Sequence, residues 1–96
     1  MIKHIVCFKL KDNSVSAKEE TRNVLMSMKG KVPQIVNIEV GIDFLSSARS
    51  YDIILQVTLN SRPDLDAYQA DEYHCSVVKE YMHAHIVSSI AIDYYI

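Results

Sequence analysis

The chain has 96 residues, 49% hydrophobic and 23% charged, and its ten basic and twelve acidic residues give a net charge of −2. This composition is typical of a single globular domain, residues 1–96, and it lacks the basic excess that nucleic-acid binding requires. No apolar run approaches the roughly 20 residues of a membrane span, so we expect no membrane insertion. The two isolated cysteines, Cys7 and Cys75, favour reduced thiols in a cytoplasmic protein.

The first predicted element is a strand. Residues 2–10 alternate in hydrophobicity, which places His4 on one face together with Val6. The opposite face carries Ile5 and Cys7 at its centre, with lysines only near the ends of the strand. Both faces of this strand are therefore apolar in the middle.

A helix follows, and then a second strand. The segment from Ser16 to Glu19 has the pattern of a capping box, which predicts the start of a helix. Gly30 lies where a left-handed residue ends such a helix, and Pro33 prevents its continuation. Residues 34–42 alternate again and predict the second strand.

The second half of the chain repeats this order of elements. Residues 51–59 alternate and predict a third strand, with Tyr51, Ile53 and Leu55 on one face and Ile54 as an apolar exception on the other face. Ser61 caps a second helix. Its apolar stripe shifts phase around residues 70–72, which predicts a kink or a break into two pieces.

Residues 86–95 predict a fourth and last strand. The order strand, helix, strand, strand, helix, strand indicates an α+β, ferredoxin-like βαββαβ fold, in which a four-stranded antiparallel sheet has both helices on one face. Two helices leave the other face bare, and the apolar residues noted above lie on it. Because such a patch is rare on a soluble monomer, we expect a homodimer that packs sheet against sheet.

The chain also resembles a known family, the stress-responsive A/B barrel (Dabb) domain of the dimeric α+β barrel superfamily. The resemblance covers nearly the whole chain and depends on the order and spacing of five segments. These are KHIVCFKLKD, KVPQIVNIEVG, SYDIILQVTLNS, LDAYQADEYH and IAIDYY. It implies a homodimeric barrel, in a family that includes stress-induced plant proteins, a plant polyketide cyclase and many small bacterial proteins of unknown role.

Three residues at matching positions form the candidate site: His4, Tyr68 and His74. If the strand face and the helix stripe meet, the two imidazoles and the tyrosine hydroxyl line the space between sheet and helices. A histidine transfers protons near neutral pH, and a tyrosine hydroxyl can stabilise an enolate oxygen. The resemblance to the cyclase implies that His74 is the base and Tyr68 its partner. That enzyme has a further histidine where this chain has Ile53.

Several interpretations remain open from sequence. The histidines are residues of the packed core, ligands of a small apolar or carbonyl-bearing compound, or catalytic groups of a cyclase-like lyase or a cofactor-free monooxygenase. A purely structural, stress-associated oligomer is the alternative to all of these. His83 and His85 have the spacing of a metal chelate, but we expect them to face solvent at a helix–strand junction. We expect no cofactor and no metal.

Overall fold

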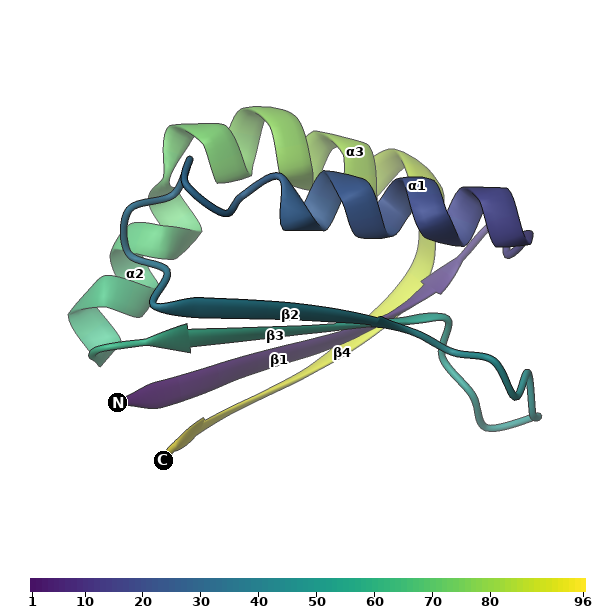
Figure 1. Cartoon of the computed structure of the whole chain (residues 1–96), viewed down its shortest axis with the longest axis horizontal. Coiled ribbons are helices and arrows are strands. Elements are labelled where there is room, and N and C mark those ends of the chain that lie inside the picture. The colour runs from purple at the N-terminus through teal and green to yellow at the C-terminus, as the bar shows by residue number, and fades with distance from the viewer.

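The computed structural model describes all residues, 1–96, and shows one antiparallel sheet with every helix on the same face (Figure 1). The sheet order is β2-β3-β1-β4. The elements in chain order are β1 (Ile2–Leu10), α1 (Val15–Met26), β2 (Asn37–Ile42), β3 (Ile53–Leu59), α2 (Arg62–Ala70), the π-helical segment η1 (His74–Lys79), α3 (Glu80–His85) and β4 (Ile86–Tyr95). The ferredoxin-like α+β prediction is confirmed.

The helix after β1 begins two residues earlier than the capping-box pattern predicts. The Ser14 hydroxyl, not that of Ser16, accepts a hydrogen bond from the Ala17 backbone N–H at 3.3 Å. Ser14 is itself held by the Asp12 carboxylate, which accepts its backbone N–H at 3.0 Å. The prediction of Ser16 as the cap was therefore wrong. Both serines can cap a helix, and Ser14 does so because Asp12 holds its backbone in place.

The turn that follows α1 ends as expected. Gly30 has a φ of +81°, in the left-handed region where only glycine is unstrained. A Cβ atom at this position would meet no other atom within 4 Å. The requirement for glycine is therefore purely one of backbone conformation.

The hydrophobic core lies between the helices and the inner face of the sheet. Side chains from β1, β2 and β3 meet those of the helices there, and the most deeply buried include Leu25, Met28, Val57, Leu59 and Tyr68. The period-two pattern of β1 predicted this face correctly, because Ile2, His4 and Phe8 are buried. β4 is different: it is an edge strand, and nearly all its side chains are exposed.

The face without helices, here called the outer face, is apolar along three of its four strands. β1 contributes Ile5 and Cys7, and β3 contributes Ile54. The register of β4 against β1 adds Ile90 and Ile92, which are 54% and 61% exposed. The predicted surplus of apolar surface is therefore present on the outer face.

Tyr51 lies on the opposite face from the one predicted. Strand pairing begins only at Ile53, and the preceding turn is held where the Asp52 backbone N–H donates to the Phe8 carbonyl at 2.8 Å. The Asp52 carboxylate also accepts the Leu10 backbone N–H at 2.8 Å. Tyr51 consequently lies near Lys9 on the outer face, with the lysine nitrogen 4.9 Å from its ring centroid.

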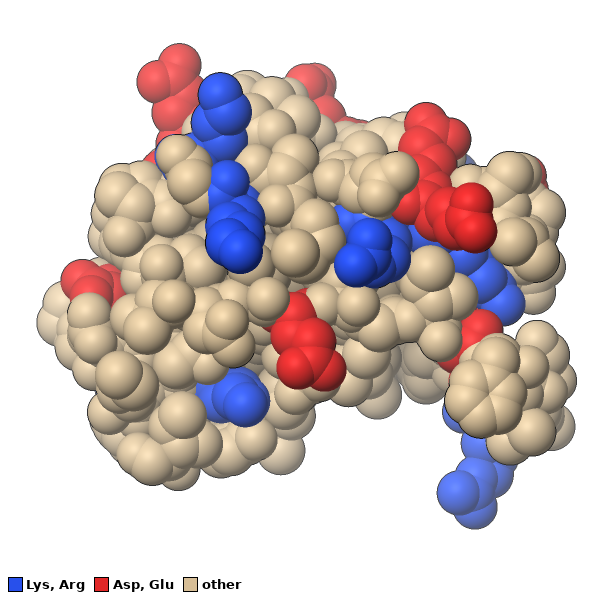
Figure 2. Space-filling view, in the orientation of Figure 1, with Lys and Arg blue, Asp and Glu red and all other residues tan.

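Charge is concentrated on the helical side of the visible surface. Basic and acidic side chains are interspersed over the helical layer, and the sheet side is mostly uncharged (Figure 2). No helix has both the length and the apolar character that crossing a bilayer requires.

Candidate functional site

A cavity of about 340 Å³ lies between the inner face of the sheet and the second helical region. Its apolar walls come mainly from Val6 and Phe8 of β1 and from Val78 and Met82 of η1 and α3. The floor near β4 is made of small residues, including Ala91. Hollows of similar volume occur elsewhere on the surface, but none of them is lined by a histidine. The chemistry of its lining, and not its size, distinguishes this cavity.

His4 is fixed in the cavity wall by a carboxylate from the neighbouring strand. The antiparallel register places His4 of β1 directly opposite Asp93 of β4, and His4 Nδ1 lies 2.5 Å from Asp93 Oδ1. His4 is buried, whereas the Asp93 side chain is 43% exposed. A neutral His4 that donates its Nδ1–H to this carboxylate keeps an unprotonated Nε2.

His74 is fixed by the backbone at the break between α2 and η1. Its Nδ1 donates to the Tyr68 carbonyl at 2.9 Å, and its backbone N–H donates to the Asp71 carboxylate at 3.0 Å. Burial lowers the pKa of His74, and the positive charge of Lys79 acts in the same direction, as does His4 when it is protonated, against the opposing effects of the Tyr68 carbonyl and Asp71. His74 is therefore neutral near physiological pH, with Nε2 as the free acceptor.

Tyr68 lies between the two histidines and is fully buried. Its ring centroid is 5.6 Å from that of His4, in an edge-on arrangement, and 4.3 Å from that of His74. Its hydroxyl donates to the Met28 sulfur at 3.8 Å, and burial raises its pKa. In this arrangement Tyr68 contributes a ring that separates the histidines, while its hydroxyl contacts the core.

The three residues singled out from sequence thus come together around one cavity. The Nε2 atoms of His4 and His74 have no hydrogen-bond partner within the chain. The only buried side-chain atom that lacks a partner is Gln34 Oε1, so neither Nε2 is fully buried. Both Nε2 atoms are therefore accessible from the cavity. Two accessible lone pairs in an apolar cavity can accept hydrogen bonds from a bound hydroxyl group or remove an acidic proton.

Comparison with known sequences gives the family. A sequence model of the stress-responsive A/B barrel domain matches residues 2–96. The chain belongs to this family. No protein with a curated description matches the sequence.

Solved structures share the fold of this A/B barrel domain. A dimeric protein of unknown function from Bacteroides fragilis has 25% identity and a TM-score of 0.81, over 99% of this chain and 95% of that chain. A dimeric ferredoxin-like protein from Thermobifida fusca has 21% identity and a TM-score of 0.82, over 99% and 90%. A structure described as an antibiotic biosynthesis monooxygenase has 15% identity and a TM-score of 0.76, over 100% and 98%. The last two show the fold alone.

The helix break beside His74 in this A/B barrel domain has a specific cause. Asp71 has an extended ψ of 134°, which ends α2, and its carboxylate then caps the next helical piece. The predicted break is confirmed. The Asp71 carboxylate thereby positions His74. Tyr73 is half-buried and donates its hydroxyl hydrogen to the Ser27 oxygen at 2.7 Å.

Sequence reasoning missed Asp93 as a partner of His4. The predicted strand ranges contained this information. If residues 2–10 and 86–95 pair antiparallel with residue 2 opposite residue 95, then residue 4 lies opposite residue 93. Lys79, which donates to the Gln69 carbonyl at 2.9 Å, also lines the cavity and was not singled out. His83 and His85 are exposed near the end of α3, as expected, and no group of three metal-ligating side chains occurs in the structure.

Proposed function

We propose that this stress-responsive A/B barrel domain binds a small apolar or carbonyl-bearing compound in the cavity between its sheet and helices. One observation carries the proposal: the Nε2 acceptors of two histidines face a mostly apolar cavity and have no hydrogen-bond partner in the protein. An apolar cavity with a few convergent polar groups is the usual form of a small-molecule site, and about 340 Å³ lies within the usual range.

The lining indicates which compounds fit. The walls favour a flat hydrocarbon or aromatic body, while the two Nε2 atoms favour hydroxyl or enol groups that donate hydrogen bonds. Lys79 adds a positive charge at the cavity, and Lys79 and His83 add further hydrogen-bonding groups, which favours a carbonyl or acidic oxygen. A phenol or enol bearing an acyl group combines these features.

The protein also acts, in this proposal, as a homodimer formed through the outer face. Related structures are described as dimeric, and this chain exposes an apolar row of Ile90, Ile92 and Tyr94 on that face. Burial of this row contributes about 25 cal/mol for each Å² removed from water. Replacement of Ile92 by Asp places a charge in the proposed interface, and we expect it to abolish the dimer in sedimentation experiments. A wild-type species of 11.0 kDa at micromolar concentration contradicts the dimer.

A second candidate is proton-transfer chemistry of the polyketide-cyclase type, favoured by two imidazoles that are both held at Nδ1, that of His4 by Asp93 and that of His74 by the Tyr68 carbonyl. A carboxylate that holds Nδ1–H orients an imidazole and stabilises its protonated form, as a general base requires. In this scheme His74 Nε2 removes a proton beside a carbonyl, the resulting enolate attacks a second carbonyl of the same molecule, and the alkoxide recovers the proton. Tyr68 acts on the enolate oxygen only if its hydroxyl leaves the Met28 sulfur, which is a weak acceptor.

The experiment is a thermal-shift screen with phloroacetophenone, acetylacetone and naphthol, repeated by calorimetry. A compound at a hundred times its Kd stabilises the fold by about 2.7 kcal/mol, equivalent to a rise in Tm of roughly 10 °C or more. Two variants test the location: His74→Asn removes one Nε2 acceptor, and Ala91→Phe fills the cavity from β4.

We expect both variants to lose binding, whereas His85→Ala, an exposed histidine outside the cavity, retains it. Absence of binding by all three compounds, or wild-type affinity in both cavity variants, favours the purely structural oligomer. Turnover of a linear polyketone by the wild type, lost in His74→Asn, distinguishes the cyclase-like candidate from simple binding.

A further inference from the structure

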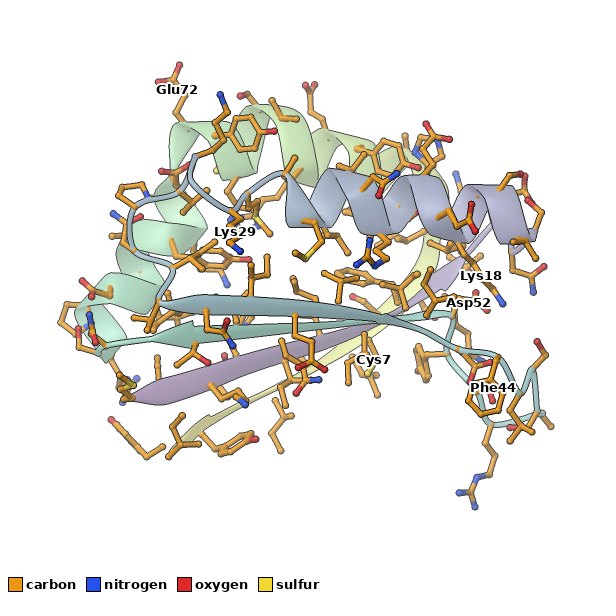
Figure 3. All side chains as sticks on the ribbon, in the orientation of Figure 1. Cys7, Lys18, Lys29, Phe44, Asp52 and Glu72 are labelled. Atoms are coloured by element: carbon orange, nitrogen blue, oxygen red, sulfur yellow. The ribbon has the colours of Figure 1, made fainter.

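The loop between β2 and β3 presents an aromatic side chain to solvent. Phe44 is 95% exposed, more than any other large apolar residue, and the adjacent Leu45 is 69% exposed. The loop projects beyond the end of the sheet on the side away from the helices (Figure 1), and Phe44 stands apart from the body of the protein (Figure 3). Such exposure is unfavourable for a side chain that has no partner.

The loop is held in shape by its own hydrogen bonds. The Asp43 backbone N–H donates to the Asp52 carbonyl at 2.9 Å and closes the base of the loop. The Asp43 carboxylate accepts the Ser46 backbone N–H at 2.8 Å, and the hydroxyls of Ser47 and Ser50 are 2.7 Å apart. Phe44 is therefore presented from an ordered loop, which reduces the entropy lost when it packs against a partner.

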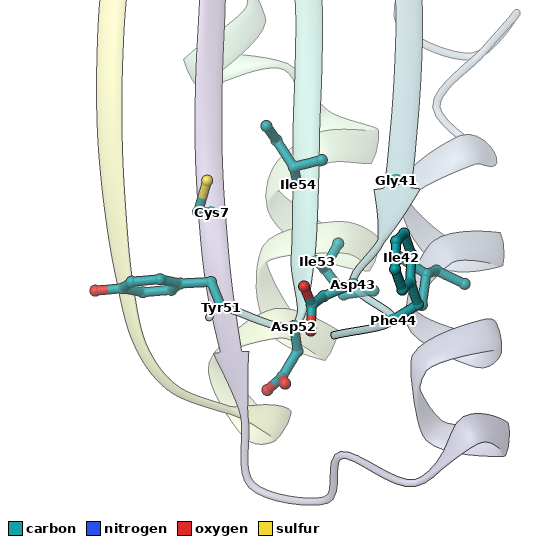
Figure 4. A pocket seen from close by; sticks show the side chains of 9 residues that line it. All are labelled: Cys7, Gly41, Ile42, Asp43, Phe44, Tyr51, Asp52, Ile53 and Ile54. Atoms are coloured by element: carbon teal, nitrogen blue, oxygen red, sulfur yellow. The ribbon is translucent and has the colours of Figure 1, made fainter. Parts of the chain in front are cut away.

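A hollow of about 360 Å³ opens on the outer face beside this loop. Its wall includes Cys7, Tyr51, Ile54 and Phe44 (Figure 4). It also includes Gly41, where a Cβ would come within 2.9 Å of Ile54 Cγ2. The absence of a side chain at this position lets Ile54 extend over β2 and leaves room above the strand.

The strand at the opposite edge of the sheet carries the complementary feature. Ile90, Ile92 and Tyr94 form an exposed apolar row on the outer face of β4, and this row contains no charged residue. The register places Gly41, Ile54, Cys7 and Ile90 at one level across the four strands. A hollow at one edge and a projecting row at the other edge therefore lie at the same height.

We propose that Phe44 of each subunit packs against the outer β4 row of a second copy, beside the partner's Ile90. This inference rests on the outer-face dimer proposed above and names its anchor. A two-fold axis parallel to the strands turns the order β2-β3-β1-β4 so that β2 of one subunit faces β4 of its partner at the same level. A two-fold axis perpendicular to the strands instead places β2 of one subunit over β2 of its partner. Phe44 then lies near the start of the partner's β2, where polar residues of the Asn37 and Glu39 type face outward and offer no apolar contact.

The area supports a second copy as the occupant. A stable interface removes about 800 Å² from each partner, and a single aromatic side chain buries about 150–250 Å². Phe44 and Leu45, added to the β4 row, supply a large part of this requirement with apolar surface.

The test is the dimer dissociation constant, measured by sedimentation equilibrium for the wild type and five variants, one of which is Ile92→Asp. Phe44→Ala removes the anchor twice in each dimer, and we expect the Kd to rise at least about 30-fold, as for other interface hot spots. Val15→Ala is the matched control, because Val15 is 74% exposed but lies on α1, on the helical side. Ile90→Ala and the double variant Phe44→Ala/Ile90→Ala complete a double-mutant cycle.

The two proposals fail in different ways. If the wild type is monomeric, or if Ile92→Asp leaves the Kd unchanged, the outer-face dimer itself is wrong. If Ile92→Asp abolishes the dimer while Phe44→Ala matches Val15→Ala, only the role of Phe44 is overturned. Non-additive effects in the cycle support the contact of Phe44 with the partner's Ile90, and additive effects overturn it.

Discussion

Replacement of His74 separates its structural role from its role in the cavity. In His74→Ala the Tyr68 carbonyl loses the imidazole donor but keeps the Asp71 backbone N–H at 3.2 Å, so the lost hydrogen bond contributes only about 0.5–1.5 kcal/mol. Removal of a buried ring that packs 4.3 Å from Tyr68 adds about 1.5–3 kcal/mol. We therefore expect a loss of about 2–4 kcal/mol, which lowers the Tm by roughly 10–25 °C.

His74→Asn is the informative comparison. The asparagine amide nitrogen occupies a position close to that of Nδ1 and can still donate to Tyr68, but it offers no group at the position of Nε2. We expect it to recover about 1 kcal/mol relative to the alanine variant, measured by urea unfolding, and still to fail to bind the ligand. His85→Ala, at an exposed position, changes stability by less than about 1 kcal/mol. Equal stability of the wild type and the alanine variant refutes the account of His74 as a buried, hydrogen-bonded residue.

Three further predictions concern stability. Because burial lowers the pKa of His74 in the folded state, the unfolded chain binds the proton first as the pH falls. The contribution of His74 to stability is therefore complete above the unfolded pKa of about 6.5 and declines below it. Urea midpoints measured between about pH 5 and pH 8 are expected to decline less in His74→Asn than in the wild type. Ser14→Ala loses about 0.5–2 kcal/mol of unfolding free energy and Ser16→Ala much less, and the reverse order restores the capping box as the helix start. Gly30→Ala lowers stability by about 1 kcal/mol or more because its φ is +81°, whereas a neutral effect in calorimetry shows that the turn relaxes.

The strands at the ends of the chain could be predicted to the residue, and the reason is physical. Residues 2–10 and 86–95 are apolar enough to be predicted as strands, and they pair with each other along nearly their whole length, with one register shift between Lys9 and Leu10. β2 is shorter than predicted, because residues 34–36 precede its continuous pairing with β3. Tyr51 continues the apolar alternation of β3 in sequence, but a turn held by Asp52 rotates it to the outer face. The alternation of apolar residues in the sequence does not show at which residue the pairing of two strands begins.

The candidate site was predictable in its membership but not in its geometry. The family resemblance singled out His4, Tyr68 and His74, and strand and helix periodicity placed each of them on an inward face. The hydrogen bond of the Tyr68 hydroxyl to Met28 depends on packing between two helices that are distant in sequence. The contact of His4 with Asp93 depends on the register of two strands at opposite ends of the chain. Both are tertiary facts that no local pattern contains.

The most direct test of the account is the nitrogen NMR spectrum of the histidine rings, recorded with and without phloroacetophenone. The free protein is predicted to show His74 as a neutral ring protonated at Nδ1 and His4 with an Nδ1–H held by Asp93, and the compound is predicted to shift the Nε2 resonance of both. A spectrum in which the Nε2 atoms carry the protons, or in which a bound compound leaves both Nε2 resonances unchanged, contradicts the proposal that these two atoms form the binding site.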